Sequence, residues 1–490
     1  MVFNSIIYVL FLSIVVLAFY IFPSKIRWIW LLIASVGYYL SFIPVFILLL
    51  GGLTVINYFL AKWLAKIPEE ETRLVFILAI LFNLIVLSLF KYFNILFPGY
   101  QIHLYNVSLS IGSEPINKMI LPLGLSYFTF TLLSYLIEIK RKNILPESHF
   151  GYFSLYLFFF PKIAQGPIER PQQLIPQLHQ NRGFNYNMLV EGLKLILWGY
   201  FKKLVVADRL AIYVNAVYGN SEKHNGTTLL VATIFYAFQI YADFSGYTDI
   251  ARGSARLFGF DLTENFKRPY FATSIKEFWN RWHISFSTWL RDYIFLPLAY
   301  FLSGRMKKPS YLFISTENWI YLIVSIITFG ICGIWHGVGW NYLCWGVLFG
   351  IYLTYSNWAK GFHKNLRKLL HVKKTSPYLL VYKIVTTFML VLLTWVFFRA
   401  ATLTEATKII GKIFTSAGAV FYHSPYDLIY SIIGIMLLIM LDFKREFFNN
   451  RLSILYSRYQ SVRIAGIVTI IIIILLIGVF DGGQFIYFQY

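Results

Sequence analysis

Two histidines, His336 and His283, lie in sequence that is otherwise largely apolar. His336 stands in the segment GICGIWHGVGWNYLCWG (residues 330–346), and His283 stands in WNRWHISFSTWLRDYIFLPLAY (residues 279–300). A bilayer interior penalises ionisable side chains, so those found there are candidates for function. An imidazole that burial keeps neutral can accept a proton, as a general base does. The alternative is a structural histidine that is hydrogen-bonded between helices.

The composition indicates that a membrane protein carries these histidines. Of 490 residues, 58% are hydrophobic and 13% are charged, whereas soluble proteins carry about 25% charged residues. We therefore predict an all-α polytopic membrane protein with roughly 11 to 13 transmembrane or re-entrant helices. The apolar segments lie near residues 4–22, 28–50, 73–92, 118–138, 190–215, 228–242, 317–335, 338–357, 378–398, 425–442 and 464–480.

The charged residues and the cysteines give further information about the kind of membrane protein this is. The formal net charge of +21 must lie in loops, where lysine and arginine beside apolar spans favour the cytoplasm and anionic lipid headgroups or an anionic substrate. The first apolar run, Ile6–Phe22, lacks a basic region before it and a cleavage site, so a retained helix is expected. Cys332 and Cys344 offer neither a disulfide framework nor metal-ligand spacing. We expect no metal site and no nucleic-acid partner.

Polar residues crowd the middle third of the chain. The segment FFPKIAQGPIERP (residues 159–171) places three prolines and a glycine among charges. Backbone of this kind is tolerated at membrane depth only inside protein or along a cavity. Asp249 and Arg252 are three residues apart on a predicted helix, which suggests a buried ion pair that holds helices in register. The segment Lys276–Asp292 mixes charges with aromatic residues, so we expect it at an interface or along a funnel.

Together these motifs resemble the membrane-bound O-acyltransferase (MBOAT) family, in its bacterial branch of alginate and peptidoglycan O-acetyltransferases. The resemblance implies one MBOAT domain over residues 1–490, with helices around a central tunnel. Residues 1–120 would form peripheral helices, 121–358 the catalytic core, and 359–490 the C-terminal helices with an acyl-relay-like tail. The matching segments are PLGLSYFTF (residues 122–130), FFPKIAQGPIERP, YADFSGYTDIARGSARLFGF (241–260), FWNRWHISFSTWLRDYIFLPL (278–298), GIWHGVGWNYLCWG and the terminal FIYFQY.

The resemblance also implies roles for the histidines. His336 falls on the family's catalytic histidine, and His283 falls on its second polar position. Acyl transfer to a hydroxyl needs a base and stabilisation of an oxyanion. A thiolate leaving group, with a pKa of about 8.5, needs little help from an acid. We therefore predict His336 as general base and His283 as orienting or oxyanion partner. The donor would be acetyl-CoA or another acyl thioester, used as a substrate and not as a bound cofactor.

Other residues are expected around these two. Trp282, Trp335 and Asn341 would line the tunnel, although each tryptophan could equally be a core or interfacial aromatic residue. A basic group would suit the phosphates of coenzyme A or an acidic carrier protein, and the alternative is that it only marks the cytoplasmic side. This group consists of Lys267, Arg268 and Arg281.

The terminal segment DGGQFIYFQY follows an apolar span and ends in aromatic residues. Composition alone favours an interfacial anchor. The resemblance favours a tail that tucks back into protein, because the teichoic acid branch relies on a peptide with a similar aromatic end. By that analogy Tyr487 would carry the acyl group, with Tyr490 as the weaker candidate. The family most often ends in FIYFQF, so Tyr490 departs from the pattern.

The preferred function is an O-acyltransferase of the bacterial inner membrane. It would move an acetyl group from a cytoplasmic thioester across the membrane for O-acetylation of a polysaccharide such as alginate or peptidoglycan. The expected partners are membrane lipid, the donor, the polysaccharide and a periplasmic SGNH-type acetyltransferase. One alternative is transfer of D-alanine or another acyl group from a carrier protein. An alternative of another class is a transporter or channel, although the internal symmetry common in transporters is not visible.

Overall fold

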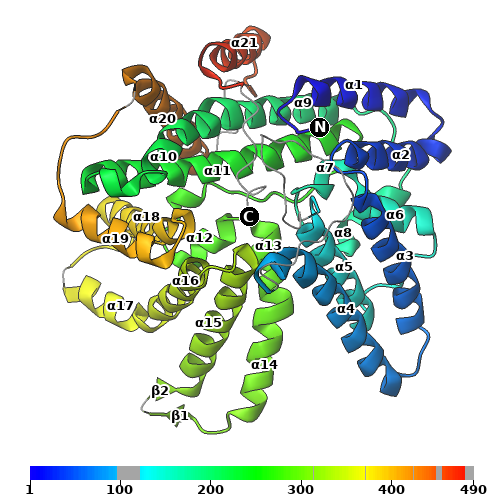
Figure 1. Ribbon diagram of the computed structural model, residues 1–490, viewed down its shortest axis with the longest axis horizontal. Helices are drawn as coiled ribbons and strands as arrows, with labels where there is room; N and C mark the ends of the chain where they lie inside the picture. The colour runs from blue at the N-terminus through cyan, green and yellow to red at the C-terminus, as the bar shows by residue number, and fades with distance from the viewer. Residues whose placement is uncertain (97–121, 313, 370, 423, 449–454, 481–490) are drawn as a thin grey trace. The chain divides into compact units, whose positions relative to one another are not determined.

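The computed structural model describes residues 1–96, 122–312, 314–369, 371–422, 424–448 and 455–480. The chain divides into two compact units, and Figure 1 labels their helices and strands. Unit 1 comprises Met1–Gly192 and Ala251–Leu262, and unit 2 comprises Leu193–Ile250 and Thr263–Tyr490. This division follows packing, whereas the expected boundaries at residues 120 and 358 follow motif content and stay a prediction.

Helices make up nearly all the regular structure of both units. Two helices, α9 (Tyr186–Tyr200) and α11 (Gly226–Leu257), contribute residues to each unit. The other helices of unit 1 are α1 (Ile6–Ile21), η1 (Ser24–Ile26), α2 (Arg27–Leu40), α3 (Phe46–Leu64), α4 (Glu69–Leu96), α5 (Leu125–Lys140), α6 (Phe150–Phe158), α7 (Phe160–Ile163) and α8 (Pro171–His179).

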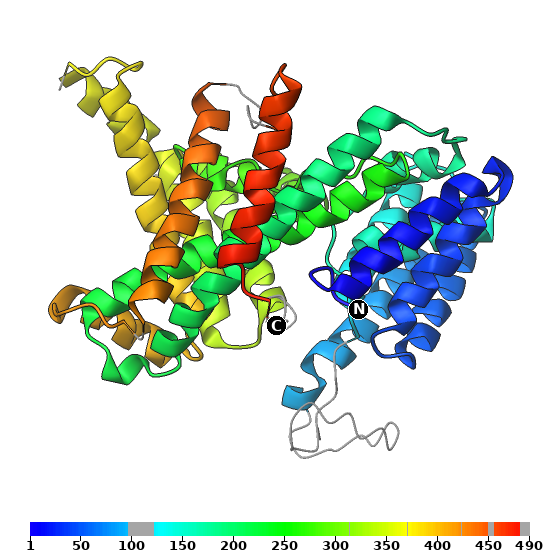
Figure 2. The ribbon, with the colours of Figure 1, turned by 90° about the horizontal axis from the view of Figure 1, so that it is seen from above.

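Unit 2 contains the remaining helices and one small antiparallel pair of strands, in which Ser310 pairs with Ser315. Figure 2 shows α20 and α21, in orange and red, as long helices with roughly aligned axes, and both pack against η2. The elements are η2 (Phe201–Ala207), α10 (Asp208–Tyr218), η3 (Ser221–Lys223), η4 (Pro269–Phe271), α12 (Ile275–Arg281), α13 (Ile284–Leu290), η5 (Arg291–Phe295), α14 (Leu296–Arg305), β1 (Ser310–Tyr311), β2 (Ile314–Ser315), α15 (Thr316–His336), α16 (Trp340–Trp358), α17 (Lys360–Leu369), α18 (Pro377–Arg399), α19 (Leu403–Thr415), α20 (Pro425–Phe447) and α21 (Gln460–Ile477).

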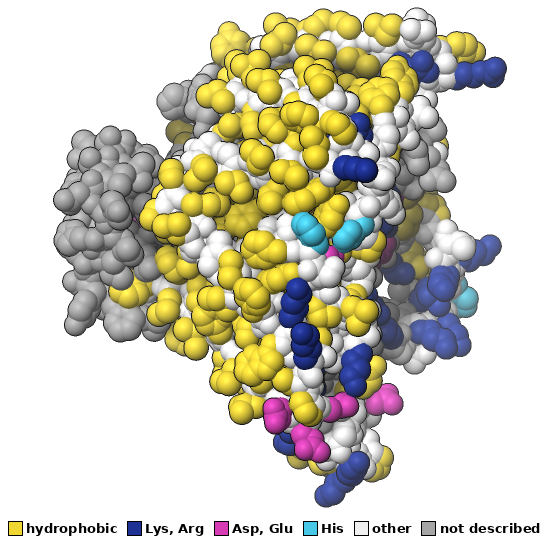
Figure 3. Space-filling view, turned by 90° about the vertical axis from the view of Figure 1, so that its right-hand side faces the viewer, with side chains coloured by type: hydrophobic (Ala, Val, Ile, Leu, Met, Phe, Trp, Pro, Cys, Tyr) yellow, Lys and Arg dark blue, Asp and Glu magenta, His cyan; other side chains and the backbone are white. Residues whose placement is uncertain are grey.

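The length and surface of the helices confirm a multi-pass membrane protein. Among the described residues, seven helices are long and apolar enough to cross a bilayer: α3, α4, α11, α15, α18, α20 and α21. Large apolar side chains of unit 1 point outward, including Ile6, Leu17 and Leu48. Figure 3 shows a face covered mainly by such side chains, with acidic residues gathered toward one end. Lipid tails solvate a surface of this kind, whereas water does not.

One apolar segment that was expected to be continuous is broken. The apolar run 28–50 forms two helices, because α2 ends at Leu40 and α3 begins at Phe46. Pro44 lies between them. Proline lacks the backbone N–H that a helix interior requires, and it disfavours helical backbone at the preceding residue. The break is therefore a local effect that hydropathy alone does not reveal.

Buried ion pairs join the helices of unit 2. The π-helix η2 carries Lys202 and Lys203, both almost fully buried. Lys202 Nζ lies 2.6 Å from Asp249 Oδ2, and Lys203 Nζ lies 2.8 Å from both Asp208 Oδ1 and Asp243 Oδ1. Asp249 thus pairs with Lys202 of a separate helical segment, whereas the sequence analysis had expected Arg252 as its partner. Removing one partner would leave the other as an uncompensated buried charge.

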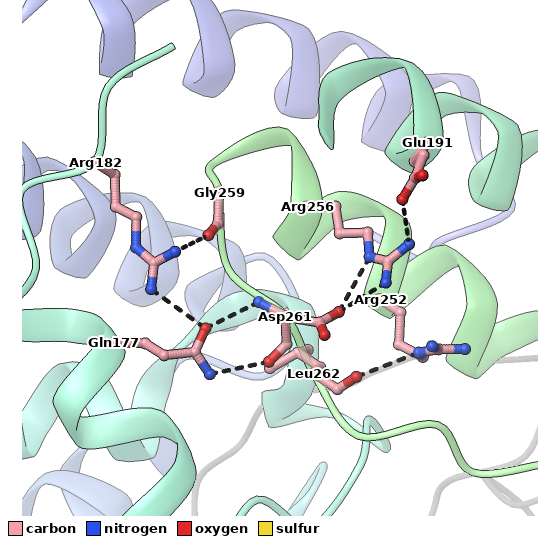
Figure 4. A network of polar contacts seen from close by, with 8 residues as sticks. All are labelled: Gln177, Arg182, Glu191, Arg252, Arg256, Gly259, Asp261 and Leu262. Carbon is pink, nitrogen blue, oxygen red and sulfur yellow. Dashed lines mark hydrogen bonds and ion pairs between the residues drawn. The ribbon is translucent and has the colours of Figure 1, made fainter. Parts of the chain in front are cut away.

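A separate polar network fixes the end of α11 within unit 1 (Figure 4). Arg256 pairs with Glu191 of α9 at 3.0 Å and with Asp261 at 2.9 Å. The side chain of Gln177 on α8 accepts a hydrogen bond from the Asp261 N–H at 3.0 Å and donates to the Asp261 carbonyl at 3.1 Å. Arg252 donates to the Leu262 carbonyl at 3.3 Å. The chain leaving α11 is therefore tied to α8 and α9.

Helices α3 and α4 are joined by a reciprocal amide pair. Asn57 Nδ2 donates to Asn83 Oδ1 at 3.0 Å, and Asn83 Nδ2 donates to Asn57 Oδ1 at 2.8 Å. Both side chains are buried between otherwise apolar helices. Such a pair satisfies two polar groups that lipid could not hydrogen-bond.

This pair makes a prediction about stability. Replacing either residue alone (Asn57→Leu or Asn83→Leu) should destabilise the protein by about 1–3 kcal/mol, because the remaining amide loses its partner. The double variant should be closer to the wild type, since no orphaned amide remains. Thermal unfolding of the detergent-purified protein, followed by size-exclusion chromatography, measures this. A double variant that loses as much stability as both single variants combined would contradict the pairing.

Candidate functional site

His336 is the last residue of α15, and its place depends on close contact between α15 and α16. A Cβ atom at Gly333 would collide with the Tyr342 carbonyl oxygen, and one at Gly346 would collide with the Phe329 carbonyl oxygen. Glycine at both positions therefore lets the two backbones approach. The result is a tight helical hairpin that presents His336 at its turn.

The surroundings of His336 are aromatic. Its side chain is buried, and its ring centroid lies 4.5 Å from Trp335, 5.1 Å from Trp345 and 5.1 Å from Phe398. These neighbours come from α15, α16 and α18. They exclude bulk water from much of the imidazole, which is the setting predicted for a base in an apolar site.

His283 sits in a strained turn between α12 and α13, outside the seven candidate spans. Its backbone is left-handed, with φ 44° and ψ 53°. For a residue with a Cβ this conformation costs roughly 1–2 kcal/mol. The turn is held because Asn265 accepts from Ile284 N through its carbonyl and from Ser285 N through Oδ1, both at 3.0 Å. Strain that the surroundings maintain in this way often marks a functional position.

Burial sets the charge of His283. Its side chain is 2% exposed and its ring lies 4.7 Å from the ring of Phe244. Desolvation lowers the pKa of His283 to about 3 because an apolar environment disfavours the imidazolium. The side chain is therefore neutral at pH 7 and can donate one hydrogen bond and accept another.

Phe286 brings the two histidines into one cluster. Its ring centroid lies 5.1 Å from His283, 6.3 Å from His336 and 4.5 Å from Trp335. Phe286 follows His283 by three residues, so it lies one turn along α13. The sequence analysis did not select Phe286, since one phenylalanine among 47 carries no distinguishing signal.

The three residues expected to line a tunnel occupy different settings. Trp282 is buried against Phe266 and Trp395, with centroid distances of 5.0 and 5.1 Å. The ring of Trp335 lies 4.5 Å from that of Phe286 and 4.5 Å from that of His336. Asn341 Nδ2 donates to the Phe397 and Ala400 carbonyls at 3.2 and 2.9 Å. Asn341 thereby ties the start of α16 to the end of α18, and the tunnel-lining role of all three stays a prediction.

The three predicted basic residues differ in how much of their charge is compensated. Arg268 Nε lies 2.7 Å from Glu446, and Arg281 Nη2 lies 2.8 Å from Glu446 and 2.5 Å from Glu277. Burial alone would raise the pKa of Glu277, but hydrogen bonds from Thr273 and the nearby Arg281 lower it overall. Lys267 is more than half exposed and lies 4.0 Å from Glu264. Lys267 is therefore the base with the most charge left for a ligand.

Acidic residues of α20 support the site and were missed by the sequence analysis. Glu446 accepts from two arginines, and Asp442 accepts from Tyr241 Oη at 2.8 Å. The ring of Tyr241 lies 6.3 Å from Trp282. Two carboxylates four residues apart at the end of an apolar span were a usable signal, because such groups need partners.

Two further expectations concern metal ions and the terminal tyrosines. In the described part of the chain, no group of three or more His, Cys, Asp and Glu side chains could hold a metal ion. Tyr487 and Tyr490 lie outside the described residues.

Comparison with known proteins gives consistent matches. Residues 16–400 match the profile of the MBOAT, membrane-bound O-acyltransferase family. The chain is 32% identical over 420 residues to the probable alginate O-acetylase AlgI of Pseudomonas aeruginosa, which covers 85% of this chain and 75% of that protein. It is 31% identical over 415 residues to the peptidoglycan O-acetyltransferase of Helicobacter pylori, covering 78% and 72%.

A more distant match is the teichoic acid D-alanyltransferase of Streptococcus thermophilus, 32% identical over 242 residues that cover 47% of this chain and 56% of that protein. The family profile spans both histidines and most of the helices described above. This multi-pass, all-α chain therefore belongs to the membrane-bound O-acyltransferase family, and it is an acyltransferase enzyme.

Proposed function

We propose that this enzyme transfers an acetyl group from a thioester donor at the cytoplasmic side of the bacterial inner membrane, for O-acetylation of an exported or cell-envelope polysaccharide. One observation carries the proposal: the rings of His336 and His283 both lie close to the ring of Phe286, and both histidines are buried away from water. The similarity to the alginate and peptidoglycan enzymes supports the acyl group and the acceptor class.

In the proposed mechanism, His336 is the general base. The acceptor oxygen attacks the thioester carbonyl carbon while a ring nitrogen of His336 takes the hydroxyl proton. The tetrahedral intermediate then collapses, the carbon–sulfur bond breaks, and the proton passes to the departing thiolate. Neutral His283 donates a hydrogen bond that orients the acceptor or stabilises the oxyanion. The products are a free thiol and an ester.

The donor is acetyl-CoA or another acyl thioester, used as a substrate. Lys267, Arg268 and Arg281 are proposed to attract its phosphates or an acidic carrier protein. Lys267 supports that role most directly, because it is exposed and its ion pair with Glu264 is long, at 4.0 Å, whereas Arg268 and Arg281 bind Glu446 at short distances. Trp282, Trp335 and Asn341 would border the path to the histidines.

The second half of the reaction requires delivery to the acceptor. We propose that Tyr487 carries the acetyl group as a phenolic ester, which is a better donor than an alkyl ester because phenolate leaves more readily. A periplasmic SGNH-type acetyltransferase would then pass it to the polysaccharide. D-alanyl transfer from a carrier protein is the second candidate, and the similarity to the teichoic acid enzyme favours it over other acyl groups.

Removal of the base should abolish transfer. His336→Ala should lower the rate of thioester cleavage by roughly 10²–10⁴-fold, the usual contribution of general base catalysis. His283→Ala should lower it less if His283 only orients. The measurement is thiol release from acetyl-CoA by the purified protein in lipid nanodiscs.

The matched control is Cys332→Ala, one helical turn before His336 and equally buried, which should keep most of the activity. A correctly folded His336→Ala protein with more than about a tenth of wild-type activity would refute the base assignment, because a lost base costs at least 10²-fold.

The relay predicts a covalent intermediate. After incubation with acetyl-CoA, peptide mass spectrometry should find one acetyl group on the terminal peptide of the wild type and none there in Tyr487→Phe. Tyr490→Phe serves as the matched control and should still be labelled. Full transfer to acceptor by the Tyr487→Phe, Tyr490→Phe double variant would rule out the relay.

A further inference from the structure

We propose that Glu446, at the end of α20, is a positioning residue that holds the turn carrying His283. Its carboxylate bridges Arg281, which ends α12 just before this turn, and Arg268, which lies on the segment 265–268 that pairs with the turn. The inference rests on the proposed function only in that the turn presents His283 to the substrate.

The bridge is short and partly buried. Glu446 Oε2 accepts from Arg268 Nε at 2.7 Å, and Oε1 accepts from Arg281 Nη2 at 2.8 Å. The side chains of Glu446 and Arg281 are 15% and 18% exposed. Hydrogen bonds between ionised groups are about twice as strong as neutral ones. Reduced contact with water also limits screening by salt.

The bridged arginines belong to two paired segments. The Lys267 N–H donates to the Arg281 carbonyl at 2.9 Å, and the Ile284 N–H donates to the Asn265 carbonyl at 3.0 Å. Residues 265–268 therefore run beside residues 281–284. Asn265 secures one end of this pairing, and the Glu446 bridge secures the other.

Both segments contain a residue in left-handed backbone conformation. Arg268 has φ 50° and His283 has φ 44°. This conformation is disfavoured for a residue with a Cβ, which comes too close to the following carbonyl oxygen. A turn under this strain relaxes unless its surroundings hold it. Glu446 is well placed to do so, since it binds one of the two strained residues directly and Arg281 two positions before the other.

The α12 side of the turn is secured separately. Glu277 binds Arg281 and also accepts from Thr273 N and Oγ1 at 2.9 and 2.6 Å. Ser274 caps α12 by accepting from Glu277 N at 3.2 Å. These contacts are local to the segment 273–281, whereas Glu446 comes from a different helix. Glu446 therefore couples the turn to the membrane-spanning helix α20.

The first test is kinetic. Glu446→Gln should lower kcat for acyl transfer by roughly tenfold or more, because small displacements of reacting groups reduce rates strongly. The KM for acetyl-CoA should stay unchanged. Glu446→Asp, which keeps the charge, should restore part of kcat. Glu222→Gln is the control, since it removes a carboxylate from an exposed ion pair of the same unit, and it should leave both parameters unchanged.

A raised KM with unchanged kcat in Glu446→Gln would overturn the proposal and assign the cluster to the donor's phosphates. Unchanged kinetics would also overturn it. If Glu446→Gln does not accumulate in the membrane, Arg268→Gln should show the same loss of kcat, because it breaks one of the two bridges. Only kcat is compared for this variant, since Arg268 is also a proposed contact of the donor.

The second test does not depend on activity. Hydrogen–deuterium exchange of the wild type and Glu446→Gln, without donor, should show faster exchange in Glu446→Gln for the peptide over residues 279–290. Peptides of α15 should not change. Equal exchange in peptide 279–290 would overturn the proposal. An inactive wild type with the expected exchange difference would instead count against the proposed function alone.

Discussion

A charged group placed inside this apolar protein needs a partner, because an unpaired buried charge costs several kcal/mol. This constraint determines which helices lie together. Lys203 requires Asp208 and Asp243, so η2 packs on α11. Glu446 requires two arginines, so α20 packs beside the segments around α12. Hydrophobic contact alone would not select these arrangements, since lipid tails are as apolar as the helices.

The sequence predicted the fold well where hydropathy decides it. Helices were expected near residues 4–22, 317–335 and 378–398, and α1, α15 and α18 occupy those regions. The break at Pro44 was readable in principle, since proline acts locally. The π-helix η2 could not be predicted from the sequence. Its backbone geometry occurs together with a buried network of lysines and aspartates that lie far apart in sequence.

The sequence singled out some residues of the candidate site and missed others. His336 and His283 were selected as candidates because a histidine stands out in apolar sequence. Phe286 was missed because the chain is 20% aromatic, so no single aromatic residue is conspicuous. The arginines were recognised as charged but given no partner, since Glu446 lies 178 residues after Arg268. Pairings across such distances are set by helix packing, which periodicity does not report.

Different contacts fix the positions of the two histidines: helix packing for His336, and hydrogen bonds to a turn for His283. Each arrangement suits the role proposed for that histidine. His336 ends a long helix locked to its neighbour by backbone contact at Gly333 and Gly346. A base needs this rigidity, because its nitrogen must meet the reacting proton within a few tenths of an ångström. His283 is set instead by a strained turn whose conformation depends on surrounding hydrogen bonds. These bonds keep the His283 ring in place before the reaction, as a hydrogen-bond donor to an oxyanion requires, because a preorganised donor needs no rearrangement when charge develops.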